Sequence, residues 1–267
     1  MKTRQQLWKA TGINLCLSVV IFGALLGLLW VMELLIPSLQ GQFLHFDNAA
    51  WVVGIPASII GVSYILSIKD PENYTGFYAG IVMSVLLGIQ FFLQEQYDST
   101  FLYFCVFIPF QIMSIVNWRK PQESEVKQSF EPEFLSMKEL TITAFAFIGI
   151  VAADYFLATF AFQKNGLSDA VEIKLFNGML IASSILANYW LIYRKNDAWR
   201  YWVIYSLAGI ALFVIINNIF SIVLFIFFLA INSMAGIAWF RITPENNYGW
   251  INERREQRER FKQRLRK

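Results

Sequence analysis

The sequence is poor in the residues that bind metals or form disulfide bonds. Its 267 residues include 2 cysteines, Cys16 and Cys105, and 1 histidine, His45. Both cysteines lie inside apolar runs, so we interpret them as small buried hydrophobic residues without a disulfide or redox role. No group of Cys, His and carboxylate residues has metal-ligand spacing. These absences exclude a disulfide-stabilised framework and give no sign of a metal or cofactor site.

Charged residues are also scarce: 15% of the chain is charged, against 57% hydrophobic and 17% aromatic residues, and the mean hydropathy is +0.48. The charges fall almost entirely between long apolar runs. A soluble domain of this length does not carry so much apolar surface. A helix needs a run of about twenty apolar residues to cross the hydrocarbon core of a bilayer. The composition therefore predicts an all-α membrane protein with several transmembrane helices.

Eight apolar runs are predicted to be transmembrane helices, at residues 13–36, 49–68, 77–94, 100–118, 139–162, 174–193, 199–216 and 219–240. The first follows a basic N-terminal segment, as a signal peptide also would. It is too long for a signal sequence, however, and lacks a small-residue cleavage site. It contains a GxxxG motif, Gly23 and Gly27, which can pack a neighbouring helix. In the fourth run, Pro109 predicts a kink just before Gln111.

The distribution of cations predicts the orientation of these helices. With the N-terminus in the cytoplasm, all 22 Lys and Arg residues except Lys164 and Lys174 fall in cytoplasmic segments or in the C-terminal tail. Such an excess on the cytoplasmic side is the usual pattern of membrane proteins. Eight spans also return the C-terminus to the cytoplasm. The basic tail from Glu253 is then expected to lie beside the anionic inner leaflet.

A pattern at the end of the fourth run recurs at the end of the eighth. Residues 111–120 read QIMSIVNWRK and residues 232–241 read NSMAGIAWFR, so an amide, a Met, a Trp and a cation match at an offset of 121. In both segments the amide precedes the Trp by about two helical turns, which places both on one helix face. An amide in an apolar helix is costly unless it faces a partner, a cavity or a ligand. The pattern predicts two equivalent helices facing one central site formed by Gln111, Trp118, Asn232 and Trp239.

Further matches extend this repeat over three helices. Tyr64 in the second run matches Tyr189 in the sixth at an offset of 125, and Gly88 in the third matches Gly209 in the seventh at 121. The fifth run lies between the two sets of three helices and restores the chain direction, so the repeats are parallel. The predicted fold has eight transmembrane helices, an extra N-terminal helix followed by a 3+1+3 parallel repeat of SWEET-like topology.

The same reading divides the chain into five segments. These are an N-terminal helix and outer loop at 1–48, a first repeat at 49–118, a linker and its helix at 119–173, a second repeat at 174–241 and a basic tail at 242–267.

Three polar or aromatic residues begin the seventh run on one helix face, Trp199, Trp202 and Ser206. Two indole rings beside a hydroxyl can stack on a flat aromatic ligand and hydrogen-bond its polar part. The alternative is that the tryptophans form an aromatic belt at the membrane interface, and it applies equally to Trp118 and Trp239.

The amides Gln111 and Asn232 lie too deep for a belt, and the alternative for them is a hydrogen bond between helices. The repeat-matched tyrosines of the second and sixth runs are weaker candidates for a cavity wall. Two acids also fall within the spans, Glu33 near the outer end of the first and Asp154 deeper in the fifth. An intramembrane acid suggests proton coupling, and a contact between helices or subunits is the alternative.

Taken together, these residues resemble the PnuC family of bacterial vitamin transporters. The resemblance covers roughly residues 50–241 and rests on Trp199-x-x-Trp202-Val203-Ile204, Asn117-Trp118-Arg119, Trp239, Asn232, Asn73-Tyr74, Leu87-Gly88-Ile89 and Phe91-Phe92. It implies a three-plus-one-plus-three bundle, with the extra N-terminal span that some members have. It also implies a homotrimer in the bacterial cytoplasmic membrane.

The resemblance further implies a function and site residues. The best-known members carry nicotinamide riboside across the inner membrane, and relatives carry thiamine, riboflavin or deoxynucleosides. The family's Trp-x-x-Trp-x-x-x-Asn element maps onto Trp199, Trp202 and Ser206, where a shorter hydroxyl replaces the amide and puts the substrate in question. The other implied cavity positions are Gln111, Trp118, Asn232 and Trp239.

Three classes of function are compatible with a chain of many membrane spans. Facilitated diffusion of nicotinamide riboside or a related vitamin, with trapping by phosphorylation in the cytoplasm, needs no ion site. An intramembrane enzyme needs paired titratable groups or a metal at membrane depth, which two isolated acids do not supply. A structural or sensory protein does not need polar residues matched across two repeats. We therefore predict a transporter whose partners are a small vitamin-like substrate, the bilayer and, by the resemblance, further copies of the chain, with no nucleic acid.

Overall fold

The computed structural model describes residues 3–35, 49–94, 97–123, 131–160 and 170–265, and this part of the chain is helical apart from short connections. In chain order the elements are α1 (Arg4–Leu35), α2 (Ala49–Ile68), α3 (Gly76–Leu93), α4 (Tyr97–Phe101), η2 (Leu102–Phe107), α5 (Ile108–Glu123), α6 (Met137–Phe160), α7 (Val171–Ile192), α8 (Ala198–Ile215), α9 (Ile219–Ile242), η3 (Glu245–Asn247) and α10 (Trp250–Leu265).

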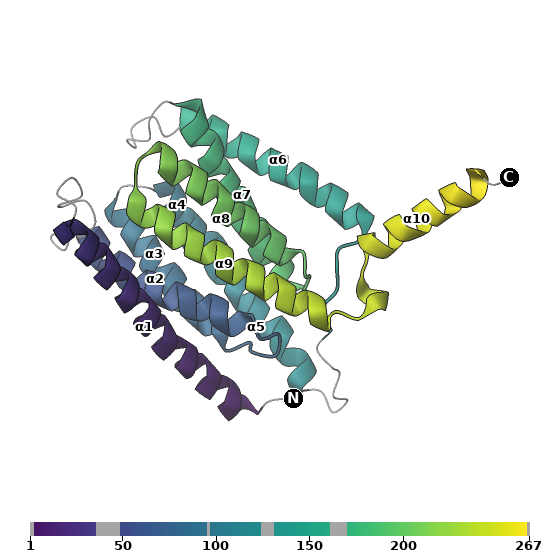
Figure 1. The fold of residues 1–267 in the computed structure, drawn as a ribbon, viewed down its shortest axis with the longest axis horizontal. Coiled ribbons are helices and arrows are strands. Elements are labelled where there is room, and N and C mark those ends of the chain that lie inside the picture. The colour runs from purple at the N-terminus through teal and green to yellow at the C-terminus, as the bar shows by residue number, and fades with distance from the viewer. Residues whose placement is uncertain (1–2, 36–48, 95–96, 124–130, 161–169, 266–267) are drawn as a thin grey trace.

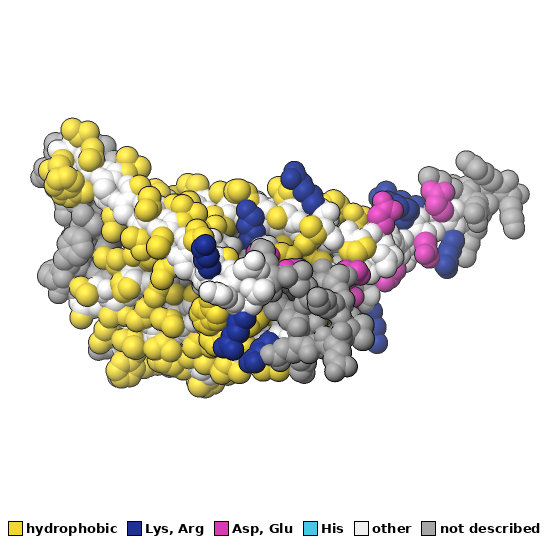
Figure 2. Space-filling model, turned by 90° about the horizontal axis from the view of Figure 1, so that it is seen from below, with side chains coloured by type: hydrophobic (Ala, Val, Ile, Leu, Met, Phe, Trp, Pro, Cys, Tyr) yellow, Lys and Arg dark blue, Asp and Glu magenta, His cyan; other side chains and the backbone are white. Residues whose placement is uncertain are grey.

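Seven of the described helical segments are long and apolar enough to cross a membrane, and Val52–Ile68 of α2 is a shorter apolar helix. Many of their apolar side chains remain exposed, as Phe145 does at 72%. Figure 2 shows apolar side chains over most of one face of the bundle, while the charged side chains on that face gather toward the end from which α10 leaves. A surface of this kind is what a bilayer covers.

The helices lie side by side in two groups that meet along the middle of the molecule (Figure 1). In one group α3 packs on α2, η2 and α5, and in the other α8 packs on α7 and α9. Contacts of α5 with α7 and of α2 with α9 join the groups. The helices α1 and α6 flank them, packed on α2 and α7. The start of α1, the ends of α5 and α9 and the start of α6 lie at one end of the bundle, here called the α10 end (Figure 1).

A polar seam near the α10 end attaches α1 to the first group. Thr11 and Thr75 share a hydrogen bond of 2.8 Å between their hydroxyls, and Asn14 donates to Ser67 Oγ at 3.1 Å. The predicted packing of the GxxxG motif in α1 is wrong for the described chain, because no described neighbour lies within 4 Å of a Cβ built on Gly23 or Gly27. The helix is therefore fixed by hydrogen bonds at one end.

One glycine–aromatic contact occurs in both groups at an offset of 121. A Cβ on Gly88 would lie 2.7 Å from the ring of Phe104, and a Cβ on Gly209 would overlap the ring of Phe225. In each group, therefore, a glycine of the middle helix leaves room for an aromatic ring of the third helix.

The backbone departs from regular α-helix where Pro109 predicted a kink. Residues Leu102–Phe107 form a π-helical turn that runs directly into α5. Proline has no N–H to give to the preceding turn and its ring crowds the carbonyl four residues back. A wider π turn is one way in which a helix adjusts to that crowding. Its counterpart α9 has no proline at the matching position and stays α-helical over Ile219–Ile242.

The interpretation of the cysteines as buried is wrong. Cys16 on α1 and Cys105 in the π turn are both exposed on the outside of the bundle. An apolar run predicts a membrane-facing position as readily as a buried one, since lipid is as apolar as a protein core.

Candidate functional site

A cluster of buried polar side chains lies where the two groups of helices meet. Gln111 of α5 donates from Nε2 to the Tyr64 hydroxyl at 3.3 Å and to Asn188 Oδ1 at 3.1 Å. Tyr64 lies on α2 and donates to Asn188 Oδ1 at 3.3 Å, and Asn188 on α7 donates to the Ser184 carbonyl at 2.9 Å. The three polar side chains are between 1% and 4% exposed. They form a hydrogen-bonded contact between the groups.

The space for Gln111 exists because α3 has a glycine beside it. A Cβ on Gly80 would lie 2.8 Å from Cδ of Gln111 and 3.1 Å from a ring carbon of Tyr64. These distances are shorter than side-chain atoms tolerate. Gly80 therefore allows the amide to reach Tyr64 and Asn188.

The matching amide, Asn232 of α9, has a separate set of partners. Its Nδ2 donates to Ser206 Oγ at 3.2 Å and to the carbonyl of Trp202 at 3.4 Å, both on α8. Ser206 itself donates to the Trp202 carbonyl at 2.8 Å. Asn232 is 1% exposed and Ser206 is fully buried. The serine hydroxyl thus holds the nitrogen of Asn232 and fixes the direction of its oxygen.

Three buried polar atoms in these two sets have no partner among the described residues. They are Oε1 of Gln111, Oδ1 of Asn232 and the indole nitrogen Nε1 of Trp202. Buried polar atoms are nearly always hydrogen-bonded, so each such atom needs an explanation. Two acceptors and one donor without partners suit a ligand that has hydrogen-bond donors for the two amides and an acceptor for the indole.

Four aromatic rings close the α10 side of the amides. Trp118 of α5 packs edge-on against Phe77 at 4.7 Å between ring centroids and tilted against Trp239 of α9 at 5.6 Å. Trp199 of α8 packs edge-on against Trp239 at 5.5 Å. Each of the three tryptophans is at most 2% exposed. Because Trp118 and Trp239 lie seven residues after the amides, this inner aromatic layer is about 10 Å from them along the helix axes.

Each central Trp also bonds across the boundary between the groups. Trp118 donates from Nε1 to the carbonyl of Leu191 at 2.8 Å, and Trp239 donates to the carbonyl of Lys69 at 3.0 Å. Arg194 adds a bond from its guanidinium to the Asn117 carbonyl at 2.9 Å. Both tryptophans therefore fasten the third helix of one group to the end of the first helix of the other.

A second aromatic cluster lies on the opposite side of the amides. Tyr205 packs edge-on against Trp202 at 5.4 Å and tilted against Phe225 at 5.2 Å. Tyr103 stacks on Phe91 at 5.4 Å and packs edge-on against Phe107 at 5.0 Å. The amides of Gln111 and Asn232 thus lie between two aromatic layers, in a closed interior.

All seven residues predicted for the site are buried, but their contacts divide them into three sets. Gln111 bonds Tyr64 and Asn188 between the groups, Asn232 bonds Ser206 and Trp202 between α8 and α9, and Trp118, Trp199 and Trp239 form the inner aromatic layer. The alternative of an interfacial aromatic belt does not describe these four tryptophans, since they are at most 8% exposed.

Sequence reasoning missed Asn188 and overestimated Tyr189. The repeat match made Tyr64 and Tyr189 candidates for a cavity wall. Tyr64 is buried and bonds Asn188 of α7, whereas Tyr189 is 38% exposed and packs near Phe110. At the same offset Asn188 matches Ser63, which is also buried. The signal that could have found it is its type: it is an amide inside an apolar run, as Gln111 and Asn232 are.

Asp154, the deeper of the two acids, lies outside this site. Asp154 lies on α6 and accepts a hydrogen bond from Asn177 of α7 at 3.3 Å. The side chain of Glu33 lies outside the described residues.

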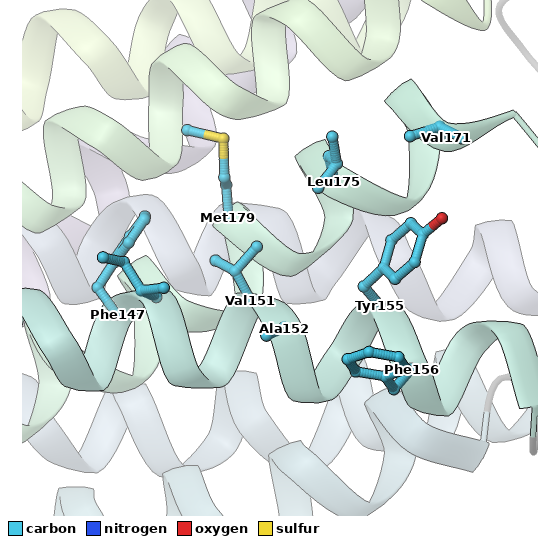
Figure 3. A pocket seen from close by; sticks show the side chains of 9 residues that line it. Phe147, Val151, Ala152, Tyr155, Phe156, Val171, Leu175 and Met179 are labelled. Atoms are coloured by element: carbon cyan, nitrogen blue, oxygen red, sulfur yellow. The ribbon is translucent and has the colours of Figure 1, made fainter.

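A groove of about 470 Å³ between α6 and α7 is lined by Phe147, Ile148, Val151, Ala152, Tyr155, Phe156, Val171, Leu175 and Met179 (Figure 3). Its apolar lining offers little to a polar ligand, and it contains none of the predicted site residues.

Ionic contacts gather in the connection between α7 and α8. Lys195 pairs with Glu133 at 2.8 Å and Glu139 at 3.4 Å, and Arg200 pairs with Asp197 at 2.9 Å. Asp197 also accepts from the Leu135 N–H at 2.8 Å. Burial raises the pKa of the Asp197 carboxyl, and the Leu135 N–H and the Arg200 charge oppose the shift. These contacts tie residues 131–136 to the first turn of α8.

An apolar helical bundle that encloses neutral polar groups between aromatic layers is typical of a membrane protein that carries a small molecule. A family model described as nicotinamide mononucleotide transporter matches residues 51–241. The chain belongs to this family. It is therefore a multi-pass membrane protein of a transporter family and not an enzyme, as the sequence resemblance implied.

The fold agrees with a solved relative. The chain is similar to a crystal structure described as the vitamin B3 transporter PnuC, with a TM-score of 0.57, 15% sequence identity, and coverage of 85% of this chain and 91% of that chain. At this identity the likeness shows the fold. A comparison with curated proteins gave no match.

Proposed function

We propose that the chain carries nicotinamide riboside, or a related vitamin or nucleoside, across the membrane by facilitated diffusion, with metabolic trapping of the substrate after entry. The observation that carries the proposal is the pair of buried amides, Gln111 and Asn232, whose side-chain oxygens have no donor among the described residues. A buried acceptor without a donor costs about 1–3 kcal/mol. The hydroxyls of a ribose and the carboxamide of nicotinamide can supply such donors.

The surroundings of the amides favour a substrate without a phosphate. The side chains that hydrogen-bond to Gln111 and Asn232 are those of Tyr64, Asn188 and Ser206, all neutral. A phosphate carries a charge of about −1.5 to −2 at pH 7, and burying it requires cations close by. We therefore favour the riboside over the mononucleotide for which the family model is described.

Trp202 is the proposed stacking surface for the flat ring of the substrate, and Ser206 acts by holding Asn232. The inner layer of Trp118, Trp199 and Trp239 is proposed to meet the substrate when the α10 end opens. Because Gln111 and Asn232 occupy matched positions above this layer, we propose that the two groups of three helices are parallel repeats that open alternately at either end.

The cation distribution supports a cytoplasmic α10 end, with both termini on that side of a bacterial cytoplasmic membrane. Eight spans follow if α2 crosses the membrane as its seven longer neighbours do. Asp154 lies on α6, away from the amides, so uncoupled transport is the simplest mechanism.

A homotrimer is proposed from the family resemblance. Mass measurement in mild detergent tests it, and a clean monomer would count against it.

Uptake into proteoliposomes tests the proposed activity. Labelled nicotinamide riboside should enter without ATP and without a proton gradient until its concentrations are equal, and nicotinamide mononucleotide should enter far more slowly. Equal or faster uptake of the mononucleotide would refute the argument from neutral side chains. If neither compound enters, transport of nicotinamide riboside by this chain would be refuted.

Thiamine, riboflavin and deoxynucleosides are the alternative substrates, because Ser206 stands where the family has an amide. Each should be tried as a competitor of nicotinamide riboside uptake. Trp202→Ala should weaken binding of the substrate about tenfold, since a stacked aromatic face contributes about 1 kcal/mol or more. Trp8→Ala, on the exposed side of α1, is the control and should leave binding unchanged.

A further inference from the structure

The C-terminal helix α10 has few contacts with the bundle, although it is 16 residues long. Its first turn is fixed: the Trp250 N–H donates to the Leu135 carbonyl at 2.7 Å, and the Arg200 guanidinium lies 4.8 Å from the centre of the Trp250 ring. Gly249, with φ +43°, makes the turn that directs the helix outward. Beyond this anchor α10 projects away from the bundle (Figure 1).

The side chains of α10 are sorted between two faces. Trp250, Arg254, Arg258 and Phe261 follow one another at four-, four- and three-residue steps, so they form one stripe along the helix. Arg255 borders this stripe. The cations of this face are exposed, and Phe261 at its far end is 62% exposed. One face of α10 therefore combines cations with an exposed aromatic ring.

The opposite face carries the acids. Glu253, Glu256 and Arg260 form a second stripe, in which Arg260 pairs with Glu256 at 3.3 Å. The two faces differ in charge: the stripe from Trp250 to Phe261 has no acid, the opposite face is mixed, and Glu259 borders the basic face beside Arg255. An isolated, highly charged helix of this length is marginal in water, so a surface that binds one face would stabilise it.

The start of α10 lies at the level at which a membrane surface is expected. Glu253 accepts from the N–H of Met137 at 3.4 Å, and Met137 is the first residue of the apolar span of α6. From that level the helix extends beyond the outline of the bundle, away from the other helices (Figure 1). The surface next to it is then the lipid headgroup region at the edge of α6.

We propose that the basic face of α10, formed by Arg254, Arg255, Arg258 and Phe261, binds anionic phospholipid headgroups of the adjacent leaflet. The cations attract the headgroups, and the ring of Phe261 enters the boundary between headgroups and acyl chains. The assignment to the cytoplasmic leaflet rests on the orientation given under the proposed function. The binding of α10 to anionic lipid does not depend on that orientation.

The test uses the full chain in nanodiscs, with Cys16 and Cys105 replaced by Ser and with Phe261→Cys carrying an environment-sensitive apolar fluorophore in place of the ring. We expect blue-shifted, brighter emission in nanodiscs containing phosphatidylglycerol and little change in pure phosphatidylcholine. Arg254→Gln with Arg258→Gln should lower the docking equilibrium constant by about tenfold or more. Arg260→Gln removes one cation from the other face and should lower the docking equilibrium constant much less than Arg254→Gln alone.

Equal emission in both lipids, or equal losses in Arg254→Gln and Arg260→Gln, would overturn the proposal. Nanodiscs expose both leaflets, and substrate binding can be measured on the same samples. A failure of the transport proposal would therefore leave the α10 result interpretable, and the reverse also holds.

Discussion

The indole rings of Trp118 and Trp239 lie 5.6 Å apart, and each donates its N–H to a backbone carbonyl of the opposite group of helices. The acceptors, Leu191 and Lys69, lie at or just beyond the ends of α7 and α2. Carbonyls at a helix end lack a donor within the helix. The Trp239 indole supplies one to Lys69, while the Leu191 carbonyl accepts both the Arg194 N–H at 3.0 Å and the Trp118 indole. The groups cannot separate at the α10 end without breaking both bonds.

Replacing both tryptophans by Phe should favour the state that is open at the α10 end. Each substitution keeps an aromatic ring and removes a hydrogen bond worth about 1 kcal/mol, so the ratio of closed to open molecules should fall about fivefold per bond. Ser114, which is 2% exposed and lies between Gln111 and Trp118 on α5, is a suitable reporter. In a variant without Cys16 and Cys105, Ser114→Cys should react faster with a thiol reagent added from the α10 side.

Trp8→Phe is the matched control for this measurement. Trp8 is 43% exposed on α1, and its ring packs on Tyr78, outside the inner aromatic layer. If its loss accelerates labelling as much as the central pair does, the indole bonds are not what keeps the α10 end closed.

Asn232→Leu should weaken substrate binding about tenfold, because a hydrogen bond between its unpartnered Oδ1 and the ligand is lost. Calorimetry gives the affinity, and thermal unfolding of the same samples gives the stability. Asn177→Leu removes a half-buried amide from α7, where it bonds Asp154, and should leave the affinity unchanged. A loss of stability in Asn232→Leu with unaltered affinity would instead make Asn232 a bridge between α8 and α9.

Gly80→Ala should weaken binding through Gln111 although it touches no ligand. The added methyl would lie 2.8 Å from the Gln111 amide carbon, so that amide must leave its bonds to Tyr64 and Asn188. Adding Gln111→Asn, which is one methylene shorter, should restore part of the affinity measured by calorimetry. Gly149→Ala on α6 has no described atom within 4 Å and serves as the control. Full affinity in Gly80→Ala would exclude Gln111 from the site.

The parts of the site that the sequence predicted are those marked by a repeated spacing. The seven-residue step from Gln111 to Trp118 and from Asn232 to Trp239 placed both pairs on inward faces, and all four residues are at most 1% exposed. The seven-residue spacing could not show whether these tryptophans contact a ligand or hold the two groups of helices together. Trp118 and Trp239 donate their N–H groups to backbone carbonyls, and no sequence pattern reveals those partners.

Two features escaped sequence analysis because they depend on how the helices meet. Asn188 bonds to Tyr64 across the boundary between the groups, and a repeat match identifies equivalent positions without showing which residues touch. Neighbouring helix positions differ in direction by about 100°, so Asn188 is buried while Tyr189 is 38% exposed. The π turn at Leu102–Phe107 likewise has no signature beyond Pro109.

Lowering the pH should stabilise the native chain relative to Asp197→Asn. Burial raises the pKa of the Asp197 carboxyl above its ordinary value of 3.8, so the folded chain binds that proton more tightly than the unfolded chain. The ionised carboxyl therefore lowers stability near pH 7, and this loss is recovered as the pH falls through the raised pKa toward 3.8. Unfolding in denaturant at several pH values measures the difference. A difference that does not change with pH would contradict the raised pKa.

Ser206→Asn should change which substrate is preferred. The Ser206 hydroxyl donates to the Trp202 carbonyl at 2.8 Å and accepts from Nδ2 of Asn232 at 3.2 Å. It therefore orients Asn232 and has little hydrogen-bonding capacity left for a ligand. An Asn at this position can bond Asn232 and still present a second amide group to the ligand. We expect the affinity for nicotinamide riboside to rise relative to thiamine, riboflavin and deoxynucleosides, measured by calorimetry on each. Ser206→Ala, which only releases Asn232, should instead lower the affinity for every substrate that binds. If Ser206→Asn changes the affinity for every substrate by the same factor, position 206 sets the strength of binding and not its selectivity.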